Sequence, residues 1–363
     1  MHVLVKCRCD RQARRPSLSQ IDLGRRASSQ RGLAELSRAG KAEASARLIA
    51  AIPAGDPIET VRPGGSRIAD PSSGGTVRVG ISGWTYPGWR GSFYPKGLRH
   101  AAELAFASRQ MSTIEINGTH YSLQRPESFA RWHDETPHGF VFAVKGSRFI
   151  THLKQLHDVA TPLANFFASG VLRLDTKLGP FLWQFGPRFR FEPDRLDRFL
   201  SLLPRDANAA AALAAHHDHR LAGRAWTGAV SRRPLRHAIE IRHKSFLDPK
   251  FVALLRQHGV ALVFADSVEW PYAEDITADF IYLRLHGSKE LYASGYSDRE
   301  LDWWAARINV WARGEEPGDA RLIAPDDPPV RTSARDVFVY FDNDAKAHAP
   351  ADARSLMRRL AQP

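Results

Sequence analysis

The chain has 363 residues, of which 43% are hydrophobic and 25% charged, and its formal net charge is +12. These fractions are typical of a globular protein, and no apolar run reaches the roughly 18–20 residues that cross a bilayer, so we expect no membrane segment. The two cysteines, Cys7 and Cys9, lie near the N-terminus. This excludes a disulfide-stapled fold and a cysteine-ligated metal site, and it favours a reducing, cytoplasmic location.

The first part of the chain differs in composition from the rest. Residues 1–76 contain 13 Lys and Arg against 7 Asp and Glu, so half of the net charge lies there. The stretch is rich in Arg, Ser and Gly and poor in aromatic residues, and such sequences bury too little apolar surface to order themselves. We expect residues 1–75 to be a disordered or low-order basic extension, with one short helix over 31–52, ahead of a body at 76–363. A start codon assigned too far upstream is an alternative explanation of this segment.

From Val77 onward, short apolar runs alternate with helix-like stretches. The runs occupy 77–84, 112–117, 140–146, 180–185, 237–242, 261–266, 280–287 and 337–344. The clearest amphipathic stretches are 100–110, 126–136, 193–203, 248–258 and 298–313, and an Ala-rich stretch at 207–223 is expected to add a helix. This order predicts parallel βα units. Eight consecutive units favour a closed (β/α)8 TIM barrel, with an open doubly wound sheet as the alternative.

Polar side chains alternate with apolar ones at the ends of these runs. Glu115 lies between Ile114 and Ile116, and Glu240 lies between two further isoleucines. A buried unpaired charge costs several kcal/mol, so we expect these groups to face the lumen and to pair with one another at the C-terminal mouth. The residues expected there are Glu115, Asn117, Lys145, Gln184, Glu240, Arg242, Asp266, Arg284, His286 and Asn343.

Several motifs resemble a known family. They are GISGWTYPGWRGSFYP (80–95), IEINGTHY (114–121), WHDETPHGFVFAVKGSRFITH (132–152), IEIRHKSF (239–246), YLRLHG (282–287) and VFVYFDND (337–344). In this order they resemble the YecE-like family, a domain of unknown function numbered 72. The resemblance covers about 77–360; it implies a TIM barrel and brings no established reaction. The chain departs from the family pattern at Phe246, His120 and Asp342, where the family usually has Trp, Phe and Asn.

Two carboxylates form the first candidate site. Glu115 and Glu240 across a barrel mouth could act as acid and base, as in glycosidases. The alternative is that the two carboxylates are structural and form an ion-pair network with cationic side chains at other strand ends, such as Lys145 and Arg284.

A divalent metal is the second candidate. His152, Glu240, His243, Asp266 and His286 could supply nitrogen and oxygen ligands. Arg284, two residues before His286 on the same face, would place a cation beside the metal. We therefore do not favour a metal, and the sequence does not identify a cofactor.

Phosphate is the third candidate ligand. The stretch 286–296 follows the seventh run with Gly, Ser and Lys, at a place where barrels often bind phosphate through backbone N–H groups. Arg242, Arg284 and Lys145 would add charge-assisted contacts. An ordinary flexible loop is the alternative.

Aromatic residues after the runs could stack on bases or sugars, or could pack loops onto the barrel. Together with the arginines, they favour a nucleotide or a single-stranded nucleic acid over a simple organic acid.

We therefore expect an enzyme that acts on a phosphate-containing substrate, a nucleotide or nucleic acid, at the mouth of the barrel. The expected catalytic residues are Glu115, Glu240, His286 and Asp266. The expected binding residues are Trp84, Tyr86, Asn117, Tyr121, Lys145, His152, Gln184, Arg242, His243, Arg284, Tyr296 and Asn343. A non-catalytic nucleic-acid-binding protein that uses the basic extension and a glycosidase-like hydrolase are the alternatives, and the sequence leaves the oligomeric state open.

Overall fold

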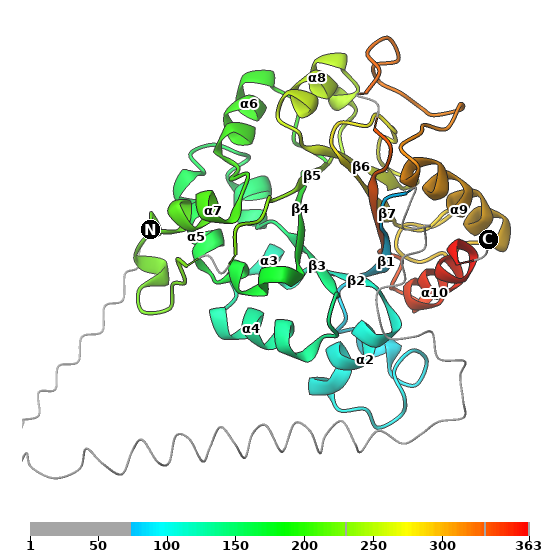
Figure 1. The fold of residues 1–363 in the computed structure, drawn as a ribbon, viewed down its shortest axis with the longest axis horizontal. Helices are drawn as coiled ribbons and strands as arrows, with labels where there is room; N and C mark the ends of the chain where they lie inside the picture. Colours follow the sequence, from blue (N-terminus) through cyan, green and yellow to red (C-terminus); the bar gives the residue numbers. More distant parts are fainter. Residues whose placement is uncertain (1–73, 229–230, 330–331, 362–363) are drawn as a thin grey trace, which may run out of the picture. The chain divides into compact units, whose positions relative to one another are not determined.

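A closed parallel barrel forms the body of the protein. The computed structural model describes residues 74–361 apart from 229–230 and 330–331. Its strands are β1 (Val77–Ser82), β2 (Thr113–Ile116), β3 (Val141–Lys145), β4 (Leu178–Gln184), β5 (His237–Glu240), β6 (Ala261–Asp266), β7 (Phe280–Leu285) and β8 (Asp336–Phe341). They pair in sequence order, and β8 pairs again with β1. Figure 1 shows these strands at the centre with helices around them. The TIM-barrel prediction is confirmed, and the open sheet is excluded.

Helices cover the outside of the barrel. They are α2 (Glu103–Gln110), α3 (Gly118–Tyr121), α4 (Pro126–Glu135), α5 (Ala160–Ala168), α6 (Pro193–Leu202), α7 (Ala207–Ala214), α8 (Pro249–Gln257), α9 (Asp298–Ala312) and α10 (His348–Leu360). Short turns of 3-10 helix are η1 (Pro87–Trp89), η2 (His100–Ala102), η4 (Val171–Lys177), η5 (His219–Leu221) and η6 (Lys244–Phe246), and η3 (Phe149–Leu153) is a π-helix. Proline is the first residue of α4, α6 and α8, where its fixed φ and missing N–H suit a helix start. The helix in the Ala-rich stretch is shorter than the predicted 207–223, because α7 ends at Ala214.

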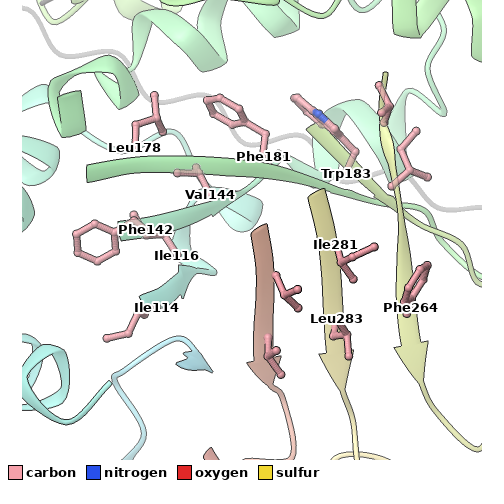
Figure 2. Close-up of a cluster of buried hydrophobic side chains, with 14 of the residues drawn as sticks. Ile114, Ile116, Phe142, Val144, Leu178, Phe181, Trp183, Phe264, Ile281 and Leu283 are labelled. Carbon is pink, nitrogen blue, oxygen red and sulfur yellow. The ribbon is translucent and has the colours of Figure 1, made fainter. Parts of the chain in front are cut away.

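Each strand has two buried faces. Residues such as Ile114, Phe142 and Ile281 belong to the apolar cluster that lies against the helices, and Figure 2 shows these side chains on three different strands. The alternate residues form a second cluster inside the barrel, which includes Tyr282 and Tyr340. The middle of the lumen is therefore filled with side chains, as in other TIM barrels, and a charged layer lies above it at the C-terminal mouth.

The alternation fixes which strand ends face the lumen. Glu115, Lys145 and Arg284 fall in the same phase as the inner cluster, as expected. Asp266 instead follows the phase of Leu262 and Phe264, which belong to the outer cluster. Its carboxylate accepts a hydrogen bond from Tyr296 Oη at 2.7 Å.

Asn343 follows the outer phase of β8 in the same way. Its amide nitrogen donates to Asp352 at 2.8 Å and to the carbonyl of Ser294 at 3.0 Å. The expectation that Asp266 and Asn343 line the lumen is therefore wrong, and Asp342 takes the inward position at the end of β8.

Among the described residues, no helix is both long and apolar enough to cross a membrane. The expected basic extension, its short helix over 31–52 and both cysteines lie outside the described residues, apart from residues 74 and 75 of the extension.

Candidate functional site

A buried guanidinium joins four strand ends at the mouth. Arg284, the fifth residue of β7, is 0% exposed. It donates to both oxygens of Glu115 at 3.1 and 2.9 Å, to Glu240 at 2.6 Å and to Asp342 at 2.8 Å. A contact of 3.3 Å to Ser82 Oγ completes the set. We call Ser82, Glu115, Glu240, Arg284 and Asp342 the Arg284 cluster.

Strand register brings the cluster together. Ser82 pairs with Glu115 across β1 and β2, and Gln184 pairs with Glu240 across β4 and β5. One layer below, Tyr282 Oη donates to Glu115 at 2.6 Å. Since Tyr282 and Arg284 are two residues apart on one strand, their side chains point the same way and contact the same carboxylate.

Contacts within the cluster stabilise the ionised forms of its carboxylates and of Arg284. Burial alone would raise the pKa of Glu240, but Arg242 and Arg284 outweigh it and hold that pKa well below its ordinary value. Burial would likewise lower the pKa of Arg284, and Asp342, Glu115 and Glu240 instead raise it well above its ordinary value. The expected pair of Glu115 and Glu240 is thus brought together, but both carboxylates are completely buried and engaged by one arginine. In this state neither can exchange a proton with a substrate, as a glycosidase would require.

A roof of aromatic residues and one arginine covers the β5–β7 side. Arg242 donates to Glu240 at 2.8 Å and to Tyr292 Oη at 3.1 Å, and its guanidinium lies 3.5 Å from the ring centroid of Trp270. Its Nη1 makes no hydrogen bond to any residue described here. Trp270 and Tyr292 both contact the ring of His286 edge-on.

His286 lies beneath this roof and is completely buried. Its Nδ1 is 3.1 Å from Asp342 and its Nε2 is 3.9 Å from Glu240, but neither nitrogen is aligned for a hydrogen bond within the described chain. Burial lowers the pKa of His286, although Asp342 opposes the shift. We therefore expect a neutral imidazole at pH 7 with unused donor and acceptor positions.

Lys145 ends β3 and is 7% exposed. Its amine forms no hydrogen bond and no ion pair with any residue that the structure describes. Burial, reinforced by the charge of Arg284, lowers the pKa of Lys145 to about 8, while Glu115 and Asp342 act in the opposite direction. Lys145 is thus a nearly buried amine beside the Arg284 cluster and not a member of it.

A second acidic group lies on the β8 side of the mouth. Burial and the charge of Asp342 raise the pKa of Asp344 to about 6. Tyr86 hydrogen-bonds the carbonyl of Ser82 at 2.6 Å, and Asn117 nearby has a buried side-chain oxygen without a partner among the described residues. This side therefore offers polar groups that a ligand or water could satisfy.

The β2–β3 side carries histidines and exposed rings. His120 bonds the carbonyl of Gly146 at 2.8 Å, and its ring meets that of His152 edge-on at 5.2 Å. Burial, with Arg242 and Lys145, lowers the pKa of His152 to about 4. Tyr121 and Phe149 are both exposed, and the Arg148 guanidinium lies near the Tyr121 ring.

The remaining expected site residues have local structural contacts. His243 caps η6 by accepting from the N–H of Ser245, and Trp84 packs edge-on against Trp132. Tyr296 accepts from the N–H of Gly287 at 3.0 Å.

The loop that was expected to hold phosphate bonds mainly to itself. The N–H groups of Lys289 and Glu290 donate to Ser294 Oγ at 2.9 and 3.0 Å, and that of Tyr292 donates to the carbonyl of His286 at 2.6 Å. These backbone donors are therefore engaged, and the candidate contacts for an anion are side chains.

Some residues of the mouth were missed from the sequence. Ser82, Tyr282 and Asp342 could have been found from the sequence. Each lies two residues from an inward-facing position on its own strand, and residues two apart point to the same face. Trp270 and Asp344 lie in loops, where no such rule applies. Across residues 74–361, outside the two short gaps, no group of three or more His, Cys, Asp or Glu side chains is arranged to hold a metal ion.

A separate small cavity lies at the opposite end of β4 and β5, between Leu178 and Leu235. It is distant from the charged groups described above, so the mouth is the better candidate site.

Comparisons with known proteins agree with the fold. The family described as "Protein of unknown function DUF72" matches residues 78–363. The UPF0759 protein YecE of Escherichia coli K12 is 30% identical over 139 residues, which are 36% of this chain and 46% of YecE. The matched part is thus under half the length of that relative.

Two solved structures share the architecture. A DUF72 family protein from Thermotoga maritima is 23% identical, with a TM-score of 0.59 over 79% of this chain and 99% of that one. One from Enterococcus faecalis is 16% identical, with a TM-score of 0.56 over 79% and 96%. With the family match spanning most of the chain, we conclude that this protein belongs to the DUF72 family of proteins of unknown function.

Proposed function

We propose that the protein is an enzyme that acts on a small phosphate-containing substrate at the C-terminal mouth of its barrel. The observation that carries this proposal is Lys145, a nearly buried amine with no hydrogen bond or ion pair among the described residues. Burying an amine without a partner is unfavourable for folding, and such groups concentrate at functional sites. Lys145 therefore supports a ligand-facing role better than a structural one.

Arg242 is the better candidate for holding the phosphate. Arg284 has its guanidinium surrounded by three carboxylates, so it cannot also bind an anion without breaking the cluster. Arg242 is fixed by Glu240 and Trp270 but retains an unused Nη1 that could donate to a phosphate oxygen. His286 is the candidate for moving a proton, because its buried ring is neutral and neither ring nitrogen has an aligned hydrogen bond among the described residues.

Ligand-dependent thermal shifts test this proposal. Inorganic phosphate, glycerol 3-phosphate and adenosine monophosphate would each be titrated into the full chain, since a ligand that binds only the folded state raises Tm with concentration. We expect at least one probe to raise Tm for the wild type, and the shift to disappear in Arg242→Gln. Arg131→Gln, on the exposed face of α4, is the matched control.

The Arg242 variant will itself melt earlier, because it leaves Glu240 with one partner fewer. The ligand-induced shift is therefore the quantity to compare. The proposal fails if no probe shifts the wild type, or if Arg242→Gln and Arg131→Gln respond equally.

A non-catalytic nucleic-acid-binding protein is the second candidate. The observation in its favour is the exposed ring of Tyr121, whose centroid lies 6.0 Å from the Arg148 guanidinium, together with the exposed Phe149 that follows Arg148 in the chain. Exposed rings beside cations suit base stacking. Binding of a single-stranded oligonucleotide should weaken steeply with salt and should be reduced in Tyr121→Ala, whereas Tyr121→Phe should bind normally. If the basic extension also contacts the nucleic acid, deletion of residues 1–75 should weaken binding of the oligonucleotide.

A further inference from the structure

Lys145 is held in one position by its neighbours. Its carbonyl accepts from Thr119 Oγ1 at 2.7 Å, and the next residue, Gly146, donates its N–H to Leu182 at 2.7 Å. A Cβ at Gly146 would lie 2.2 Å from the ring of Trp183, so the backbone passes too close to that ring for any other residue. The backbone under Lys145 is therefore rigid, and its side chain is directed into the mouth.

The surroundings of the Lys145 amine favour its neutral form. Carboxylates that would stabilise a positive charge at the same place also act on it. Burial and Arg284 lower its pKa from 10.5 to about 8. Glu115, Glu240 and Asp342 also act on its charge. A neutral amine is the nucleophilic form of lysine, and a positively charged group formed in its place would be stabilised by the same carboxylates.

We propose that Lys145 forms an imine with a carbonyl carbon of the substrate, which makes the substrate a phosphate-bearing aldehyde or ketone. This rests on the proposed function in placing the phosphate at Arg242. It does not require Lys145 to bind the phosphate.

The step balances without an oxidant or reductant. The Nζ lone pair attacks the carbonyl carbon, the C–N bond forms, and the C=O bond breaks. The ammonium first gives one proton to a base, which frees this lone pair. Overall, the ammonium form and the carbonyl give a protonated imine and one water, so two of the three ammonium protons leave with the carbonyl oxygen. His286, whose Nδ1 lies 3.1 Å from Asp342, is the candidate group to carry these protons between Nζ and the departing oxygen.

The protonated imine would then withdraw electrons from the adjacent carbon. Proton removal or carbon–carbon bond cleavage at that carbon is the class of reaction that such an imine supports. His286 is the candidate base for this step, because burial keeps its imidazole neutral.

Reductive trapping tests the proposal directly. The full chain would be incubated at pH 7.5 with dihydroxyacetone phosphate and sodium cyanoborohydride, which converts an imine into a stable secondary amine. Intact-mass measurement and peptide mapping then locate the adduct. The pKa of about 8 gives Lys145 roughly two orders of magnitude more neutral amine at this pH than a lysine with the reference pKa of about 10.4. We therefore expect Lys145 to be labelled much faster than the exposed Lys250.

Two variants serve as controls. The labelled lysine is located in the wild-type protein, so the test still works if a variant does not fold. Lys145→Arg should lose the adduct, while Lys250→Arg should keep it. Labelling spread over surface lysines, with Lys145 no faster than Lys250, would overturn the imine.

Glycerol 3-phosphate separates this proposal from the function on which it rests, because it carries the phosphate and lacks the carbonyl. If it raises Tm through Arg242 while Lys145 stays unlabelled, the imine fails and the proposed function survives. If none of the three phosphate probes raises Tm and Lys145 stays unlabelled, both fail.

Discussion

At the residue scale, the mouth combines two kinds of buried cation. Arg284 donates to three carboxylates, whereas Lys145 has no such partner in the described chain. Buried ion pairs often contribute little net stability, yet removing one partner is strongly destabilising because the other charge stays buried. The two residues should therefore respond in opposite ways to replacement by an apolar side chain.

Arg284→Met should destabilise the protein by about 3–5 kcal/mol at pH 7, because Glu115, Glu240 and Asp342 would lose their shared donor. Urea unfolding measures the change. Arg359→Met is the control, since Arg359 pairs with exposed Asp298 and Asp302, and such a pair contributes about 0–1 kcal/mol. Equal losses in the two variants would show that the Arg284 cluster does not hold the strand ends together.

The phase of a strand can be read directly from the sequence where one of its faces is polar. In β2 and β7, Glu115 and Arg284 interrupt apolar runs with a period of two, so their phase can be read directly. In β6, the run ALVFAD is apolar on both faces, so nothing in it shows which way Asp266 points. The same ambiguity in β8 led to Asn343 being placed in the lumen instead of Asp342.

At the element scale, local sequence signals predict most of the helices. The same signals explain why the sequence did not predict α5 and α10. The segment of α5, ATPLANFFA, is largely apolar and buried, so it lacks an amphipathic period. In α10, Pro350 suggests a loop, but it lies in the first turn, where a missing N–H leaves no helical bond unmade. The contacts of Trp270 and Tyr292 depend on loops whose conformation is set by the folded barrel, and no local pattern predicts them.

The start of α9 gives a test at this scale. Ser297 and Glu300 form a capping box, and the helix follows the loop that carries Tyr292. Ser297→Ala should lower the free energy of unfolding by about 1 kcal/mol, because one N–H of the first turn loses its acceptor. Ser201→Ala, at an exposed position near the end of α6, should have little effect. If chemical denaturation gives the same small change for both, the box contributes nothing measurable.

At the scale of the whole molecule, buried histidines tie stability to pH. Burial lowers the pKa of His120 to about 3 and that of His237 to about 4, from an ordinary value of 6.5. His237 accepts from Trp183 Nε1 at 3.2 Å and bonds the carbonyl of Pro204 at 2.8 Å, so it is held neutral. Between pH 6.5 and 4 the unfolded chain binds protons that the folded chain does not, and stability therefore falls as the pH falls.

We expect unfolding free energy to be highest above pH 6.5 and to fall steadily down to about pH 4, with His237 contributing on the order of 3 kcal/mol. Urea titrations at a series of pH values measure this slope. His237→Gln should reduce the slope even if it lowers stability overall, whereas His216→Gln, at an exposed position, should not. A slope unaffected by His237→Gln would contradict this assignment.

The central claim is that Lys145 is retained for a ligand and not for the fold, and the unfolding free energy of Lys145→Met at pH 7 tests it most directly. The folded protein must bury a charge that the variant lacks, a penalty on the order of 3 kcal/mol from the lowered pKa of about 8. We expect the variant to be at least as stable as the wild type, and the wild type to gain stability between pH 8 and 10.5 as the amine loses its proton. A variant that loses several kcal/mol, as Arg284→Met is expected to do, would show that Lys145 is part of the structural network.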